Sequence, residues 1–166
     1  MTEAAERRGG PPRGGPRPAG PPRPDGRRPP EPFRPIEPAD LRAIVVDGNA
    51  ATTIQEAQRL ARVLAGERLE ARQATGAALR VAWGDLRRLE LEWPEKGGRD
   101  LPLLKPKLAY LAGRAGGAGR GVGDLHQTLA PAIDLVEGDR DRFTNLVQFV
   151  EAVMAYYYAG PHYSGR

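Results

Sequence analysis

The apolar residues of this chain recur at helical spacing and predict a bundle of helices. Leu104, Leu108 and Leu111 fall on one face of a 3.6-residue helix, and no segment sustains the period-two alternation of a strand. Ala, Leu, Arg and Glu dominate the periodic segments, and they favour helix. Only ten residues are aromatic (two Trp, five Tyr and three Phe), which suits close helix–helix packing. The sequence therefore predicts an all-α fold, a small bundle of about five to six helices.

Prolines, glycines and capping residues predict where these helices begin and end. Thr53 and Glu56 form a candidate capping box for the second helix, and Asp139 or Asp141 should cap the last one. Pro131 should kink the fifth helix, because proline removes a backbone hydrogen bond. We expect helices at about 39–46, 53–65 and 72–92, a loop at 94–98, a fourth helix from Lys105 to the glycines that begin at Gly113, and two more helices at about 125–136 and 143–158.

The apolar stripes also predict which residues form the core. Ile54, Ala57, Ala61 and Leu64 share one face of the second helix. Each of the later helices has a stripe of the same kind, which should be buried against its neighbours. We expect burial at helix–helix contacts for Leu108, Trp83, Phe143 and Val150.

The first 35 residues differ in composition from the rest of the chain. Pro, Gly and Arg dominate, and a segment with so few apolar residues cannot bury enough surface to offset its chain entropy. Residues 1–35 hold eight Arg and four acidic residues, a net charge of +4, and the whole chain is also +4, so residues 36–166 are neutral. We expect a disordered tail at 1–35, a helical domain at 36–160 and a frayed terminus at 161–166. The tail is either a solubilising extension or a weak RNA-binding arm.

The residues that usually build catalytic and metal sites are scarce. The chain has no Cys, which excludes disulfides and thiolate metal sites and suits a reducing compartment. His126 and His162 are the only histidines, and Ser164 lies in the expected frayed terminus. The glycine-rich run at 113–123 lacks the Lys-Ser/Thr ending of a phosphate loop and follows a helix rather than a strand. We therefore expect no enzyme activity, no cofactor and no metal.

The hydropathy of the chain gives no sign of a membrane protein. The N-terminus has no apolar signal core, and no run reaches 18 apolar residues. We therefore expect a cytoplasmic protein with no membrane partner.

A second stripe on the fourth helix carries the most informative side chains. Lys107, Tyr110 and Arg114 share a face about 100° from the apolar stripe. Such a stripe is either a solvated charged flank or a surface that meets an anion. Because the folded region is neutral overall, nucleic-acid binding would require local segregation of charge on its surface.

Three segments of the chain support a family resemblance. They are Leu104-Lys-Pro-Lys-Leu-Ala-Tyr-Leu-Ala-Gly-Arg114, Phe149-Val-Glu-Ala-Val-Met-Ala-Tyr156 and Thr75-Gly-Ala-Ala-Leu-Arg80. Together they resemble the small subunit of type III-A CRISPR effector complexes, the Csm complexes, in order over about residues 36–160. The first segment is the most specific. Gly76 and Ala78 depart from the family's Thr-Ser-Gln-(Ile/Leu)-Arg pattern.

This resemblance implies a function in antiviral defence. It implies a non-catalytic helical bundle that stacks in several copies as an inner filament along a guide RNA–target RNA duplex. The implied protein partners are the backbone-forming subunits and, at one end of the filament, the large subunit of the Csm complex. Guide pairing reads the sequence in such a machine, so contacts from this subunit need only follow the phosphates.

The candidate RNA-binding residues have different origins. Arg80 and Arg114 match basic positions of the family, whereas Lys107, Lys105 and Arg87 are added because of their spacing along helices. Arg120 borders the glycine-rich run, where the backbone of RNA can approach closely. Tyr110 either stacks on a ribose or base or bridges two helices. The full set is Arg80, Lys107, Arg114, Lys105, Arg87, Arg120 and Tyr110.

Two other function classes are compatible with the sequence. One is a helical protein–protein scaffold subunit without direct RNA contact, in which the basic stripes are merely solvated. The other is an enzyme, although no catalytic site is recognisable. Salt-dependent RNA affinity would distinguish the scaffold from an RNA-binding subunit, and turnover by the purified protein would support the enzyme.

Overall fold

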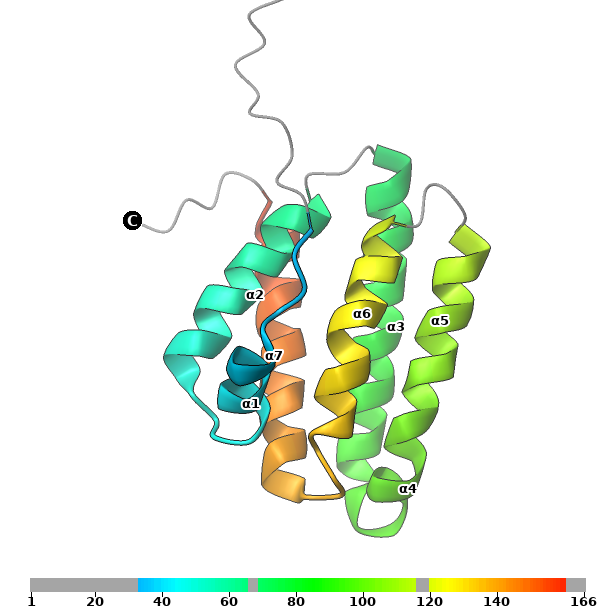
Figure 1. Ribbon diagram of the computed structural model, residues 1–166. Helices are drawn as coiled ribbons and strands as arrows, with labels where there is room; N and C mark the ends of the chain where they lie inside the picture. The colour runs from blue at the N-terminus through cyan, green and yellow to red at the C-terminus, as the bar shows by residue number, and fades with distance from the viewer. Residues whose placement is uncertain (1–32, 66–68, 116–119, 161–166) are drawn as a thin grey trace, which may run out of the picture.

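The computed structural model describes residues 33–65, 69–115 and 120–160 of the chain, and within these ranges the regular elements are helices, with no strand (Figure 1). The all-α prediction is therefore confirmed. Most of the expected tail, residues 1–32, and the expected frayed terminus at 161–166 lie outside the described residues.

The helices follow one another with short connections. Three short elements, including one turn of π-helix and one of 3₁₀-helix, occupy the connection at 93–103 that the sequence assigned partly to a loop. The order is α1 (Pro38–Val45), α2 (Ala50–Ala65), α3 (Leu69–Leu91), η1 (Trp93–Gly97), α4 (Gly98–Asp100), η2 (Leu101–Leu103), α5 (Leu104–Ala115), α6 (Arg120–Asp134) and α7 (Arg140–Ala159).

The five long helices run up and down the bundle (Figure 1). α2 packs mainly on α7, α5 packs mainly on α6, and α3 contacts α5, α6 and α7. In Figure 1, α2, α5 and α7 end at the top of the bundle, where α3 and α6 begin. We call this the upper end of the bundle, and the opposite one the lower end.

The core is built mainly from leucine, with two phenylalanines from α7. Leu108, Phe143 and Val150 are buried as expected. Trp83 is only partly buried, and Ile54 is 47% exposed, so both expectations were wrong. The buried face of α2 is rotated so that it includes Leu60 rather than Ile54. Fully buried large side chains include Phe143, Phe149, Ile44, Leu60, Leu64, Leu79, Leu86, Leu89, Leu108, Leu125, Leu129 and Leu146.

Two helix starts show how capping set the boundaries. Asp139 caps α7 by accepting a hydrogen bond from the Arg142 backbone N–H at 2.9 Å, as predicted. α2 begins earlier than expected, because the Asn49 side chain accepts from the Thr52 N–H at 3.0 Å. The predicted capping box is therefore wrong. Glu56 instead is buried and forms an ion pair with Arg59 at 2.6 Å.

The glycines near the end of α5 interrupt the helices less than expected. Gly113 lies inside α5, which continues to Ala115, and Gly121 and Gly123 lie inside α6. Pro131 is also accommodated within α6. The rest of the glycine-rich run, residues 116–119, lies outside the described residues.

The segment before α1 lies against the bundle. The Arg34 carbonyl accepts a hydrogen bond from the Arg59 guanidinium at 2.9 Å, and Ile36 is buried. Phe33 is partly buried against the core, so the packed region includes a residue that the sequence assigned to the tail.

A stacked aromatic pair joins the π-helical turn η1 to the start of α7 at the lower end of the bundle. The rings of Trp93 and Phe143 have centroids 4.2 Å apart and an interplanar angle of 20°. A Cβ atom at Gly97 would overlap the Trp93 ring, so this ring can lie over the π-helical turn only because residue 97 is glycine.

Replacing Phe143 should lower the free energy of unfolding by more than replacing Trp83. Phe143→Ala removes a buried, stacked ring, so we expect a loss of about 3–5 kcal/mol in the free energy of unfolding. Trp83→Ala should cost clearly less, because its ring is partly exposed. Urea denaturation followed by circular dichroism measures both, and equal losses would contradict the assignment of Phe143 to the core.

Two glycine substitutions test the packing at Gly97. Gly97→Ala should destabilise the protein by about 1–3 kcal/mol, as overpacking does. Gly84 is the matched control, because it lies in α3 and a Cβ atom added there would have nothing within 4 Å. Gly84→Ala should therefore stabilise by roughly 0.5–1 kcal/mol through helix propensity. Thermal unfolding should show a lower melting temperature for Gly97→Ala and a higher one for Gly84→Ala than for the parent chain. A Gly97→Ala variant as stable as the parent chain would contradict the proposed packing.

Candidate nucleic-acid interface

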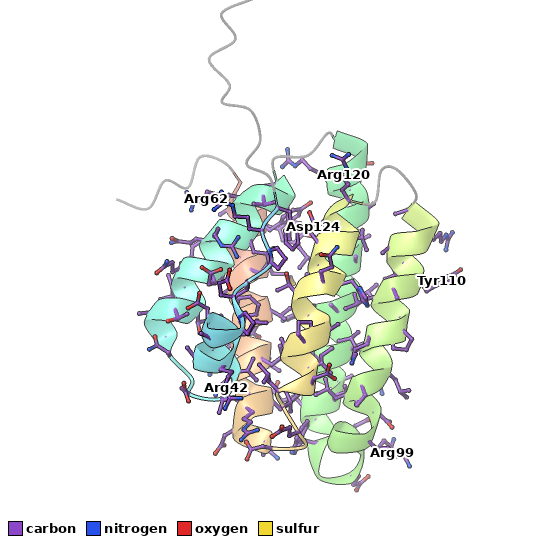
Figure 2. The ribbon with its side chains drawn as sticks, viewed as in Figure 1. Arg42, Arg62, Arg99, Tyr110, Arg120 and Asp124 are labelled. Carbon is purple, nitrogen blue, oxygen red and sulfur yellow. The ribbon has the colours of Figure 1, made fainter. Side chains whose placement is uncertain are left out.

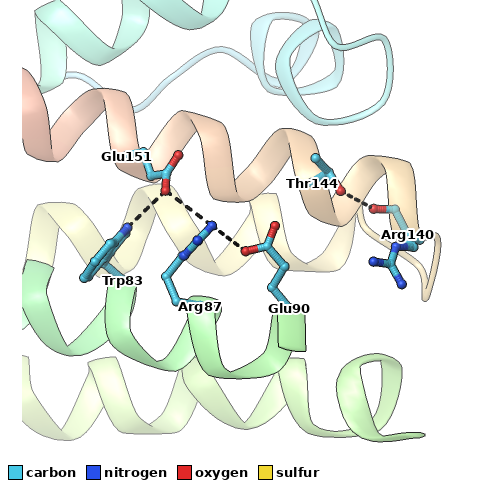
Figure 3. Close-up of polar contacts among 6 residues, drawn as sticks. All are labelled: Trp83, Arg87, Glu90, Arg140, Thr144 and Glu151. Carbon is cyan, nitrogen blue, oxygen red and sulfur yellow. Dashed lines mark hydrogen bonds and ion pairs between the residues drawn. The ribbon is translucent and has the colours of Figure 1, made fainter. Parts of the chain in front are cut away.

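The candidate surface is built on α3, which lies between α7 and α5 in the close-up of Figure 3. Exposed residues recur along α3 at helical spacing: Gln73, Ala77, Arg80, Gly84, Arg87 and Leu91. Basic side chains reach from this stripe toward α7 on one side, and from α5 toward α3 on the other. The surface therefore contains two seams, α3–α7 and α3–α5.

The lower part of each seam is neutralised by carboxylates. Arg87 of α3 contacts Glu90 at 2.5 Å and Glu151 of α7 at 3.6 Å (Figure 3). Glu151 also accepts a hydrogen bond from the Trp83 indole at 3.4 Å. In the other seam, Lys107 of α5 pairs with Asp85 of α3 at 2.5 Å. These pairs are partly exposed and so contribute little to stability, but they cancel the charge that Arg87 and Lys107 would offer to an anion.

Lys105 does not belong to this surface. Its ammonium group pairs with Asp134 of α6, with N–O distances of 2.7 and 2.9 Å. Lys105 and Lys107 are about 200° apart around the axis of α5, so they lie on opposite flanks of that helix. The sequence placed both among the candidates, and the structure separates them.

Arg80 has a different kind of partner. Its guanidinium donates a hydrogen bond to the hydroxyl oxygen of Tyr158, and it lies 5.9 Å from the centroid of that ring. Tyr158 in turn donates to the carbonyl oxygen of Gly76 at 3.1 Å. A phenol is neutral, so Arg80 is oriented without losing its positive charge.

Arg114 is exposed and makes no ion pair or hydrogen bond with the described residues. It follows Lys107 by seven residues, which places it on the same flank of α5, about 10 Å nearer the upper end. Arg80 precedes Arg87 by seven residues in α3, which runs the other way, and so it too is about 10 Å nearer the upper end than its paired neighbour. Arg80, at the middle of α3, and Arg114 therefore lie nearer the upper end than Arg87 and Lys107, one in each seam.

The upper end of the bundle gathers further arginines. Arg120 opens α6 and Arg62 lies in the last turn of α2, and Figure 2 shows both at this end. Arg72, in the second turn of α3, lies near the same end. None of these three side chains pairs with a carboxylate among the described residues. Arg62 and Arg72 were not among the residues predicted from the sequence, because only the helix directions place them toward this end of the bundle.

Tyr110 lies apart from the helix contacts. It is 66% exposed and points outward from α5 in Figure 2. The alternative in which Tyr110 bridges two helices is therefore wrong, and its ring is available to a partner.

The described residues contain no group of three or more His, Cys, Asp or Glu side chains placed to hold a metal ion. None of the described helices is both long enough and apolar enough to cross a membrane.

The fold of the described residues is that of a small all-α bundle. The family model described as Csm2 Type III-A matches residues 47–161, which is more than half of the 166 residues. The chain therefore belongs to this family and is a structural, small subunit of the type III-A CRISPR effector, the Csm complex. No curated protein and no solved structure matches the chain significantly.

Proposed function

We propose that this subunit binds RNA through phosphate contacts at the upper part of the two seams and takes no part in catalysis. The observation that carries the proposal is the pair of arginines on either side of α3. Arg80 and Arg114 are exposed, and neither has a carboxylate partner among the described residues. An arginine without a carboxylate partner can bind phosphate without first breaking an ion pair.

The surface between the two arginines suits close contact with a polyanion. Ala77 and Gly84 lie on the exposed stripe of α3, where a methyl group and a hydrogen atom add little bulk between the seams. Arg62, Arg72 and Arg120 add charge at the upper end. These side chains are spaced along helices rather than gathered in a pocket, which favours contact with a backbone over recognition of bases.

In the effector, the proposed target is the guide RNA–target RNA duplex. Several copies of the subunit would lie along it as an inner filament, in contact with the backbone-forming subunits and, at one end, with the large subunit. Contacts to phosphate are independent of sequence, as a complex directed by guide pairing requires. The localisation proposed for this assembly is cytoplasmic.

A protein–protein scaffold without RNA contact is the second candidate. It is favoured by the carboxylate pairs at Arg87, Lys107 and Lys105, which leave those cations little free charge. The exposed apolar side chains of Leu91 (86% exposed) and Leu103 (63% exposed) near the lower end also suit contact with protein.

Charge reversal distinguishes the two candidates. Arg80→Glu and Arg114→Glu should each weaken RNA binding by a similar factor for RNAs of unrelated sequence. Each should also reduce the slope of the logarithm of the binding constant against the logarithm of the salt concentration by about one unit. Arg99→Glu is the matched control, because Arg99 is also exposed but lies at the lower end, beside Asp100 (Figure 2). Filter binding at several salt concentrations measures affinity, and circular dichroism checks the fold.

The control defines the outcome that would contradict the proposal. Arg99→Glu should change RNA affinity far less than either of the other two reversals. A folded Arg80→Glu/Arg114→Glu double variant with unchanged affinity would favour the protein–protein scaffold.

The number of copies tests the filament part of the proposal. Native mass spectrometry of the assembled effector should show two or more copies of this subunit, with more copies on longer guides. A single copy at every guide length would be incompatible with a filament, whatever the affinity of the isolated chain for RNA.

A further inference from the structure

Tyr158 makes the contacts expected of a residue that holds another in place. Its hydroxyl donates to the Gly76 carbonyl at 3.1 Å, and the same oxygen accepts a hydrogen bond from the Arg80 guanidinium. A carbonyl only accepts, so the direction of both hydrogen bonds is fixed. The Tyr158 ring is additionally held edge-on to Tyr157, with ring centroids 5.2 Å apart.

Gly76 leaves room for this arrangement. A Cβ atom at Gly76 would lie 3.3 Å from the Tyr158 hydroxyl oxygen and 3.4 Å from the Tyr157 ring. The first of these distances is tighter than ordinary van der Waals contact, so a larger residue would push Tyr158 away from α3. The neighbouring Tyr157 hydroxyl donates to the Arg72 carbonyl, one turn earlier in α3. Two consecutive tyrosines therefore fasten the end of α7 to the beginning of α3.

The hydrogen bond to Tyr158 orders the Arg80 side chain without neutralising its positive charge. A free arginine loses most of its rotamer freedom when it binds a phosphate, and a side chain that is already ordered loses less. A carboxylate would order Arg80 equally well but would compete with phosphate for the same donors. Tyr158 occupies one donor of the guanidinium, which has five, and adds no charge.

We propose that Tyr158 is a positioning residue for RNA binding, which holds the Arg80 guanidinium ready to contact phosphate. The inference rests on the proposed function, because it requires that Arg80 contacts RNA. It adds a residue that the basic pattern of the sequence does not reveal. It also gives the departure of Gly76 from the family pattern a physical reason.

Tyr158→Phe tests this role, because it removes the hydroxyl and keeps the ring. In the full chain, it should weaken binding of a labelled RNA duplex by about three- to tenfold, as loss of one hydrogen bond does. The salt slope should stay unchanged, since Arg80 retains its charge, whereas Arg80→Gln should lower both the affinity and the slope. Thr144→Val is the matched control, because it also removes a hydroxyl that donates to a backbone carbonyl, at Arg140 near the opposite end of α7 (Figure 3), and it should bind like the parent chain.

A double variant distinguishes positioning from a general structural effect. Added to Arg80→Gln, Tyr158→Phe should cause no further loss of affinity. The inference would be overturned if Tyr158→Phe lowered RNA affinity equally in the parent chain and in the Arg80→Gln variant. It would also be overturned if Tyr158→Phe left the affinity of the parent chain unchanged while Arg80→Gln lowered it. Either result would leave the proposed function intact. If Arg80→Gln and Arg114→Gln both bound RNA normally, the proposed function would fail and the inference with it. Thermal unfolding of every variant confirms that the compared chains are folded.

Discussion

The packing of α3 against three other long helices is the constraint on which the surface of this subunit depends. Contacts with α5, α6 and α7 bury most of the circumference of α3 and leave one exposed stripe along it. Because α5 and α7 lie on either side of this stripe, side chains from all three helices meet in two seams. The same packing fixes which cations share a face: Lys107 is turned toward α3, whereas Lys105, two residues earlier, is turned toward α6.

Within the two seams, the chemistry of each cation depends on its partner. Arg87 and Lys107 are paired with carboxylates, so an anion that approached them would have to displace an existing ion pair. Arg80 is paired with a phenol, and Arg114 has no partner among the described residues. By helical spacing alone the four side chains are equivalent, since each is a basic residue on an exposed helical face. The structure divides them into a neutralised lower pair and a cationic upper pair.

Much of the fold could be predicted because it follows from local patterns. The apolar spacing was sufficient for α5 and α7, and Asp139 marked the start of α7 by its own side-chain chemistry. Errors occurred where a competing contact, either within the same helix or with another helix, determined the position of a side chain. Thr53 and Glu56 fit a capping box, but Glu56 is drawn instead to Arg59, which also holds the backbone at Arg34. Trp83 continues an apolar stripe, yet its position at the edge of the α3–α7 contact leaves it partly exposed.

The candidate site was less predictable than the fold, because its contacts join residues that are distant in the sequence. Spacing along one helix shows which side chains share a face, but not which side chain of another helix pairs with them. Asp85 and Lys107 are 22 residues apart in the sequence, and Arg80 and Tyr158 are 78 residues apart. Nothing in the local sequence of either partner indicates these contacts. The upper-end arginines Arg62 and Arg72 were missed because their shared location depends on the directions of α2 and α3.

Distance decides whether the paired carboxylates would oppose RNA at the upper arginines. Along α3, Arg80 and Arg87 are separated by about 10 Å. The Debye length at physiological ionic strength is about 8 Å, so exposed charges that far apart are largely screened from one another. Glu151 and Asp85 also have nearby cations that offset their charge. A phosphate at Arg80 or Arg114 would therefore experience mainly the arginine that it contacts, and a neutral chain can present cationic positions over one part of its length.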